Sequence, residues 1–80
     1  MSKSKILETL KRMDWISQHW RVKDFLVLED DEKIIFSYYH GDMGLIDKIE
    51  YNKKDGDTIV YDLDNYTGNT YIYTRLYLPL

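Results

Sequence analysis

Hydrophobic side chains in the first twenty residues recur at spacings of three and four positions. This period predicts an amphipathic helix that begins near Lys5 and ends between Ser17 and Trp20. Ser2 or Ser4 can cap its N-terminal end, because a serine hydroxyl accepts a hydrogen bond from a free backbone N–H at that position. The predicted apolar stripe consists of Ile6, Leu10, Met13, Ile16 and Trp20.

From Val22 onward the hydrophobic period shortens to about two, which is typical of strands. Clusters of glycine, aspartate and asparagine divide this part of the chain, and the only proline, Pro79, follows the last segment. No crossover helix separates the segments, so neighbouring strands are expected to be antiparallel. The predicted strands are 25–28, 33–39, 45–51, 58–63 and 70–78. The turns between them are predicted at 29–32, 41–44, 53–57 and 64–68.

These elements predict an α+β fold in which the N-terminal helix packs on a five-stranded antiparallel meander, flat or curled into a partial barrel. Residues 1–80 are expected to form a single domain. Hydrophobic residues make up 44% of the chain, which is enough for a packed core and argues against disorder. A core of this size is near the lower limit, so self-association would add useful burial.

The chain has no cysteine, no apolar segment of the roughly 20 residues needed to cross a bilayer, and no signal-like apolar region near its start. These features favour a cytoplasmic protein without membrane contact. Its richness in Lys, Ile, Tyr, Asp and Asn is typical of small proteins from low-GC bacteria and their phages.

Charge is divided unevenly along the sequence. Residues 1–23 hold six basic and two acidic side chains, a net charge of +4, whereas the remaining residues hold five basic and twelve acidic side chains, a net charge of −7. A basic helix therefore precedes an acidic sheet, and this asymmetry bears on the choice of partner rather than on the fold.

The last predicted strand carries the most prominent candidate binding surface. Strand alternation places aliphatic side chains on one face and large polar or aromatic side chains on the other. Tyrosine and arginine are enriched at binding hot spots, and tyrosines can also stack nucleic-acid bases. The alternative is that these residues only cover the outer face of a thin sheet, where tyrosine and threonine are favoured. The row expected to face the core is Ile72, Thr74, Leu76 and Leu78. The outward row is Tyr71, Tyr73, Arg75 and Tyr77.

Trp15 is a second candidate, because helical geometry places it opposite the apolar stripe. There it would be an exposed anchor beside Lys11, Arg12 and His19. The alternative is that the helix ends early, which would allow both Trp15 and Trp20 to pack into the core.

The acidic turns are a third candidate, represented by Asp30, Asp31, Asp62 and Asp64. An acidic surface can compete with nucleic acid for a basic groove on another protein. Aspartate also favours turns for a local reason, because its carboxylate accepts hydrogen bonds from nearby backbone N–H groups.

Catalytic motifs are absent from the sequence: it has no Gly-rich phosphate loop, no His-Glu-x-x-His and no Gly-x-Ser-x-Gly. His40 beside Asp42 could exchange protons, and Asp62 with Asp64 could hold a divalent ion loosely, but each set lacks further partners. The sequence therefore predicts a protein that is not an enzyme and carries no cofactor or metal.

The leading hypothesis is a non-enzymatic protein-binding module, such as a small bacterial or phage-encoded inhibitor or regulator of a larger, nucleic-acid-processing enzyme. One alternative is single-stranded nucleic-acid binding through the tyrosine-rich strand or the basic helix face at Lys11, Arg12 and Arg21. The other is a homodimer, formed if the long last strand lies at the sheet edge and pairs with its copy.

Overall fold

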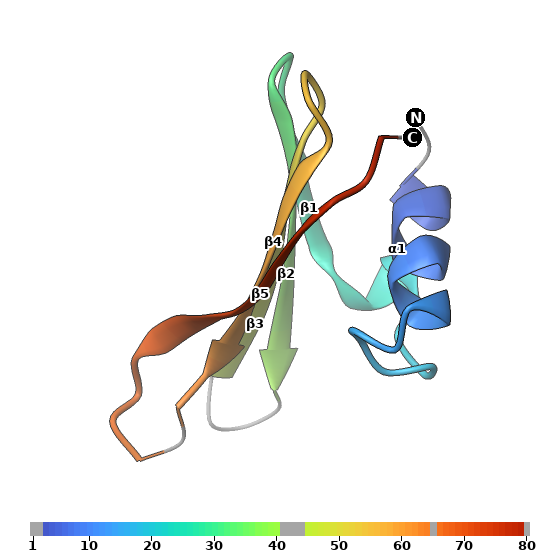
Figure 1. Ribbon diagram of the computed structural model, residues 1–80. Coiled ribbons are helices and arrows are strands. Elements are labelled where there is room, and N and C mark those ends of the chain that lie inside the picture. Colours follow the sequence, from blue (N-terminus) through green and yellow to red (C-terminus); the bar gives the residue numbers. More distant parts are fainter. Residues whose placement is uncertain (1–2, 41–44, 65, 80) are drawn as a thin grey trace.

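The computed structural model describes residues 3–40, 45–64 and 66–79. Its five strands form one antiparallel sheet in chain order, β1-β2-β3-β4-β5, and α1 covers one face of this sheet (Figure 1). The predicted α+β fold with a five-stranded meander is confirmed, and the sheet is open rather than closed. The helices are α1 (Lys3–Arg12) and the short 3₁₀ helix η1 (Val22–Asp24). The strands are β1 (Leu26–Glu29), β2 (Lys33–His40), β3 (Leu45–Asn52), β4 (Asp57–Leu63) and β5 (Thr70–Tyr77).

The strand register defines two faces of the sheet, because residues directly opposite each other on antiparallel strands share a face. Phe36 is opposite Val27 on β1 and Ile49 on β3, and these residues lie on the face that α1 covers, here called the helix face. The intervening residues lie on the opposite face, here called the outer face. One complete row of outer-face residues crosses all five strands: Leu28, Ile35, Glu50, Ile59 and Arg75.

The core lies between α1 and the helix face. Ile6, Leu7 and Leu10 of α1 are almost completely buried, as are Ile34 and Phe36 of β2. Burying a side chain of this size stabilises the fold by about 1.5–3 kcal/mol. The other buried hydrophobic residues are Ile16, Phe25, Ile49, Tyr51, Val60 and Leu78.

The helix begins and ends earlier than the hydrophobic period predicts. It begins at Lys3, so Ser4 lies within its first turn and is not its cap, while Ser2 is outside the described residues. It ends at Arg12, and Met13, expected in the apolar stripe, is 45% exposed. The predicted end between Ser17 and Trp20 is therefore wrong.

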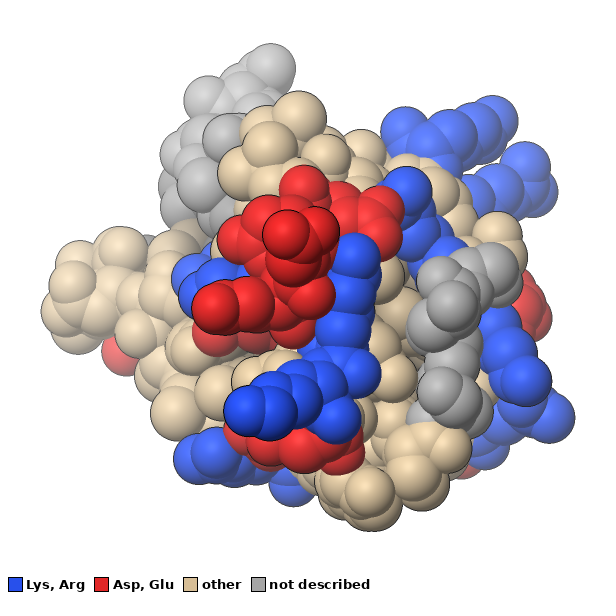
Figure 2. Space-filling model, turned by 90° about the horizontal axis from the view of Figure 1, so that it is seen from above, with Lys and Arg blue, Asp and Glu red and all other residues tan. Residues whose placement is uncertain are grey.

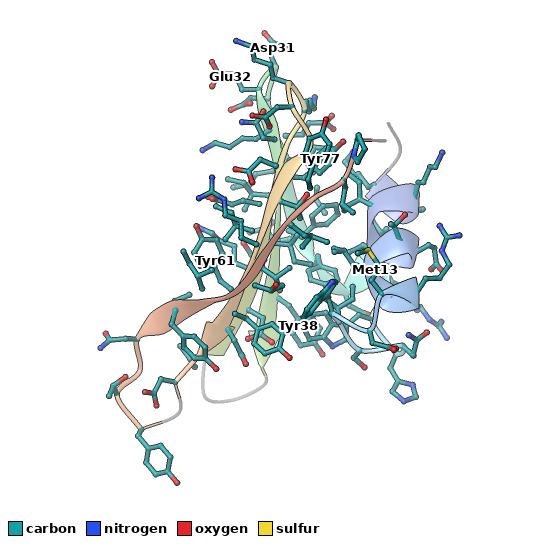
Figure 3. All side chains as sticks on the ribbon, in the orientation of Figure 1. Met13, Asp31, Glu32, Tyr38, Tyr61 and Tyr77 are labelled. Atoms are coloured by element: carbon teal, nitrogen blue, oxygen red, sulfur yellow. The ribbon has the colours of Figure 1, made fainter. Side chains whose placement is uncertain are left out.

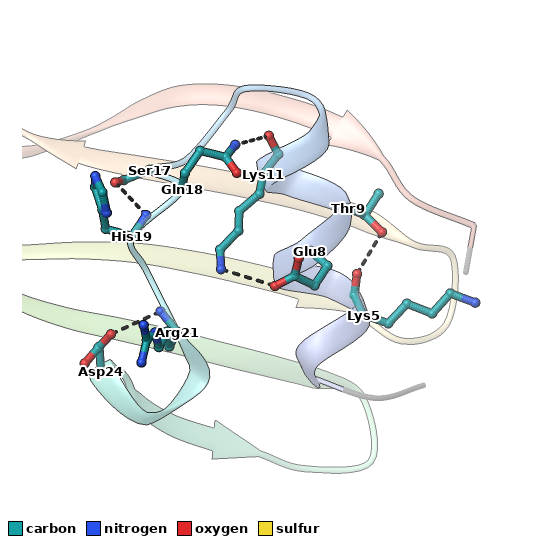
Figure 4. Close-up of polar contacts among 9 residues, drawn as sticks. All are labelled: Lys5, Glu8, Thr9, Lys11, Ser17, Gln18, His19, Arg21 and Asp24. Carbon is teal, nitrogen blue, oxygen red and sulfur yellow. Dashed lines mark hydrogen bonds and ion pairs between the residues drawn. The ribbon is translucent and has the colours of Figure 1, made fainter.

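Asp14 is the physical reason for the early end. Its φ of 59° is left-handed, a conformation that aspartate tolerates better than most residues. The backbone N–H of Asp14 donates to the carbonyl of Lys11 (3.0 Å), and that of Trp15 donates to the carbonyl of Leu10 (3.0 Å). This pair of bonds is the Schellman arrangement that closes a helix. The Gln18 side chain then donates to the same Lys11 carbonyl (Figure 4; 2.7 Å).

Aromatic side chains connect the segment after the helix to the sheet. Trp20 stacks on Tyr38, with ring centroids 5.0 Å apart, and meets the edge of Phe25 at 5.5 Å. Of the two tryptophans that an early helix end would release, Trp20 thus packs against the core, whereas Trp15 remains 37% exposed.

At the other end of the chain, Leu78 closes the core beneath the turn that precedes β4. Its backbone N–H donates to the Gly56 carbonyl (2.8 Å), and its carbonyl accepts a hydrogen bond from the hydroxyl of Tyr51 (3.2 Å). Figure 1 shows this segment running from the end of β5 toward α1. Gly56 has a φ of 78°, and a Cβ there would collide with the Leu78 carbonyl.

A β-bulge in β5 overturns the expected division of the last strand into two rows. The register shifts between Val60 and Tyr61, which are opposite Thr74 and Ile72, so Tyr73 is the extra residue. Alternation is reversed beyond this point.

As a result, neither predicted row of β5 lies on one face. Arg75 and Tyr77 are on the outer face, where Ile72 joins them opposite Tyr61. Tyr71 and Tyr73 belong to the other side of the sheet: Tyr71 is opposite Asp62, and Tyr73 meets a residue of the helix-side segment. In the row expected to face the core, Thr74 and Leu76 lie on the helix face, and Leu78 is buried just beyond the end of the strand. Ile72 is the residue that leaves this row.

Candidate binding surfaces

The outer face carries exposed hydrophobic side chains on both edge strands. Leu26 and Leu28 of β1 are 53% and 57% exposed, and Ile72 of β5 is 56% exposed. Half-buried Ile35 and Ile59 lie next to them on β2 and β4. No helix among the described residues covers this face (Figure 1). The face therefore has two hydrophobic flanks, and exposed apolar patches on a sheet surface are typical of contact surfaces.

A polar cluster lies at the centre of this face. Lys48 Nζ is 3.2 Å from Glu50 Oε1 and 4.8 Å from the ring centroid of Tyr61, and the Tyr61 hydroxyl donates to Glu50 Oε2 (3.1 Å). Burial and this carboxylate raise the pKa of Tyr61, so its hydroxyl keeps its proton. Figure 3 shows Tyr61 on the side of the sheet away from Met13 and α1.

Arg75 and Tyr77, two of the predicted binding residues, lie at the β5 edge of the same face. The Arg75 guanidinium donates two hydrogen bonds to Asp57, at 3.0 and 2.7 Å, and lowers the pKa of that carboxyl. Both charges are thus already paired within the chain. Tyr77 is 65% exposed.

Of the other two tyrosines of the predicted row, Tyr73 lines a cleft on the helix side, and Tyr71 contacts Asp62 in the wall of that cleft. Tyr73 meets Trp15 edge to face, with ring centroids 6.3 Å apart and planes at 78°. The Tyr71 hydroxyl lies 3.4 Å from Asp62 Oδ2, and the charge of Asp62 raises the pKa of Tyr71. The sequence singled out Trp15, the row with Tyr71 and Tyr73, and Asp62 as three different candidates, and the fold brings these residues to one region.

This cleft has a volume of about 440 Å³ and lies between residues 14–20 and strands β3, β4 and β5. Three aspartates contribute to its wall: Asp14 from the helix end, Asp47 from β3 and Asp62 from β4. Its aromatic lining comes from Trp15, Trp20, Tyr61 and Tyr73. The cleft therefore combines negative charge with aromatic surface.

The acidic turns lie at opposite ends of the sheet, and their carboxylates perform local roles. Asp30 Oδ1 accepts hydrogen bonds from the backbone N–H groups of Glu32 and Lys33, at 2.7 and 2.9 Å. Asp64 Oδ1 accepts in the same way from Tyr66 (2.8 Å), at the end of the sheet where Asp62 also lies. These bonds are the turn chemistry expected of aspartate.

The acidic turn at residues 29–32 also has basic neighbours. Lys53 Nζ is 2.7 Å from Glu29 Oε2 and donates to the Asp30 carbonyl (2.7 Å), and Lys3 of α1 is 3.0 Å from Glu29 Oε1. Figure 2 looks onto this end and shows acidic and basic side chains side by side. Asp31 is exposed beside them, with its side chain at the tip of the turn (Figure 3).

The structure adds no contacts for the other candidates that the sequence suggested. The Gly41–Gly44 turn and the His40–Asp42 pair lie outside the described residues or have side chains that are not described. Among the described residues, no group of His, Asp and Glu side chains could hold a metal ion. No described helix is long and apolar enough to cross a membrane. Comparisons with protein-family models, curated proteins and solved structures find no match.

Sequence reasoning missed the hydrophobic part of the outer face and two of the three cleft aspartates. The sequence does indicate the hydrophobic outer face at Leu26 and Leu28. These leucines flank Val27 in a continuous apolar run, so both faces of this strand are hydrophobic. Asp14 and Asp47 carry no comparable signal, since the cleft joins segments that are distant in sequence.

Proposed function

We propose that this chain is a non-enzymatic protein-binding module and that its outer face is the contact surface. The exposure of Leu26, Leu28 and Ile72 on a sheet face without a covering helix is the observation that carries this proposal. The partner is a protein with apolar side chains that meet the two hydrophobic flanks and polar groups that meet the Lys48–Glu50 centre. A role as an inhibitor or regulator of a larger enzyme remains a prediction from the sequence.

The size of the molecule is compatible with such a contact. A standard protein–protein interface buries about 800 Å² on each partner. The chain exposes 5424 Å² in total, so one such interface would use about one-seventh of this surface. One face of the sheet is enough.

Charge distribution favours a protein partner over nucleic acid. Binding of single strands requires a basic groove along which bases can stack. On the outer face Lys48 and Arg75 are each paired with a carboxylate. On the helix face Tyr71 lies beside the negative charge of Asp62. The helix that carries Lys11 and Arg12, α1, lies on the other side of the sheet from the outer face (Figure 1).

Two features of the sheet disfavour the homodimer. β5 does lie at the edge, as the self-association hypothesis requires, but its bulge at Tyr73 interrupts the ladder that a second copy would extend. In a face-to-face dimer the Lys48–Glu50 pairs would be buried near the two-fold axis, where loss of water opposes their charge.

A capture experiment with matched variants tests the proposal. The chain is immobilised and exposed to bacterial and phage-infected extracts, each divided into nuclease-treated and untreated halves. We expect one protein to be retained in both halves, and the double substitution Leu28→Lys with Ile72→Lys to reduce its retention at least tenfold, roughly 1.4 kcal/mol. Both positions are more than half exposed, so circular dichroism should show an intact fold.

The control variant adds the same charge on the helix side, through Ser4→Lys and Met13→Lys, both at exposed positions. It should retain the partner. Equal retention by both variants would exclude the outer face as the contact surface. Retention that disappears with nuclease would support nucleic-acid binding, and a mass that rises with concentration in sedimentation would support the homodimer.

A further inference from the structure

The cleft lies on the helix side, and among its described lining residues Tyr61 alone also belongs to the outer face. Residues 14–20, which follow the helix, form one wall, and strands β3, β4 and β5 form the other. Its volume of about 440 Å³ lies within the range of roughly 300–1,000 Å³ that is usual for small-molecule sites.

The charge of the cleft has one sign. Asp14, Asp47 and Asp62 line it, and no lysine, arginine or histidine is found among the described residues of its wall. Asp47 is only 8% exposed, so β3 brings a carboxylate into a largely buried part of the wall.

The aromatic side chains of the cleft are the second feature typical of a site for organic cations. Trp15 and Tyr73 meet at 78°, so that together they form a corner with two differently oriented ring faces. Trp20 also lines the cleft and is held by its stack on Tyr38. Ring faces carry negative potential and attract organic cations, Trp most strongly.

We propose that this cleft binds an alkylammonium or guanidinium group. The carboxylates supply charge and hydrogen-bond acceptors, and the Trp15–Tyr73 corner supplies cation–π contact and covers the apolar part of the ligand. The group can come from a free amine or from a lysine or arginine side chain of a protein. The inference does not depend on the outer face, and its test needs no partner protein.

The two tryptophans provide the readout, because their indole N–H groups give two resolved signals in a ¹H–¹⁵N spectrum. The probes are N-acetyl-arginine methylamide, the free diamine 1,4-diaminobutane, and the neutral isostere N-acetyl-citrulline methylamide. We expect both cations to shift the Trp15 indole signal and the backbone signals of the cleft in a saturable manner. The affinity should fall as salt is added, and citrulline should have little effect.

Variants separate binding from folding. Asp14→Asn keeps the left-handed backbone at the helix end and Asp62→Asn keeps an acceptor for Tyr71, so both should fold normally and weaken cation binding about threefold each. Trp15→Ala should weaken it about fivefold, with Trp20 as the remaining reporter. Asp31→Asn removes the same charge from the far end of the sheet and should leave binding unchanged.

The two sources are distinguished by comparing the probes. Tighter binding of the diamine supports a small-molecule site, and tighter binding of the blocked arginine supports a site for a basic side chain; either result supports the proposal. It is overturned if neither cation gives a saturable shift up to about 20 mM, if citrulline gives equal shifts, or if Asp31→Asn weakens binding as much as Asp14→Asn.

Discussion

Ile34 and Ile35 are neighbours on β2, yet the first is 1% exposed beneath α1 and the second lies on the uncovered outer face. The same contrast holds for the two faces as a whole. The helix face gathers the core and, beside it, the cleft, whereas the outer face presents leucine and isoleucine on its flanks around a salt-bridged centre. Similar hydrophobic side chains therefore stabilise the fold on one face and are available for contact on the other.

The contrast should be largest in the free energy of unfolding of two isoleucine variants. Ile34→Ala leaves a cavity in the core and should destabilise the protein by about 4 kcal/mol, near the upper part of the range for such deletions. Ile35→Ala, on the same strand, should lose about 1 kcal/mol because its side chain is already partly in water. Chemical denaturation measures both. Equal losses would mean that the outer face is also a core.

A second test concerns the segment that seals the helix face. Gly56→Ala forces a Cβ against the Leu78 carbonyl and strains a left-handed φ, so we expect a loss of about 3 kcal/mol. Gly68→Ala is the matched control, with a similar φ of 75° but no atom within 4 Å of its Cβ, and it should lose about 1 kcal/mol. A similar loss in both variants would show that the Leu78 contact contributes little to stability.

A substitution of Asp14 tests whether this cleft residue also stabilises the fold. Glycine is the preferred residue at this left-handed position, so Asp14→Gly should raise the free energy of unfolding by about 0.5–1 kcal/mol. Thermal denaturation at neutral pH gives the sign. Destabilisation would mean that the Asp14 side chain supports the structure, which would weaken the case for a binding role.

The smallest expected effect is a pH dependence of the free energy of unfolding, to which a carboxyl group on each face contributes. Lys53 and Lys3 lower the pKa of Glu29 on the helix face, and Arg75 lowers the pKa of Asp57 on the outer face. A carboxyl whose pKa is lower in the folded chain than in the unfolded chain stabilises the folded state at pH values above its unfolded pKa. This contribution disappears as the pH falls below about 4. Because both groups are well solvated, the effect should be small.

Substitution can separate the two contributions. Asp57→Asn should remove only the outer-face part of the decrease in stability on acidification, as measured by unfolding at a series of pH values. A decrease that is unchanged in this variant would show that the Arg75–Asp57 pair contributes no measurable stability.

The sequence predicts the fold through patterns that are local. Apolar spacing locates the helix, and alternation with turn residues locates the five strands to within one or two positions. The helix end is missed because Ile16 and Trp20 continue the helical period, although Asp14 has already closed the helix and both side chains reach the core from an irregular segment.

The candidate surfaces depend on geometry that no local pattern contains. The bulge at Tyr73 shifts half of β5 by one position, so the tyrosine row that the alternation predicts is divided between two faces. Trp15 and Tyr73 are far apart in sequence and meet only because the helix ends early. The outer-face rows likewise depend on the register of all five strands.

The most direct test of the division between the faces is a methyl ¹H–¹³C spectrum of the Leu- and Ile-labelled chain, recorded as a captured partner protein is added. The account predicts that the methyl signals of Leu26, Leu28 and Ile72 shift or broaden first, while those of Ile6, Leu7 and Leu10 beneath the sheet remain in place. Changes confined to the helix-face methyls, with the outer-face signals unaltered, would contradict it.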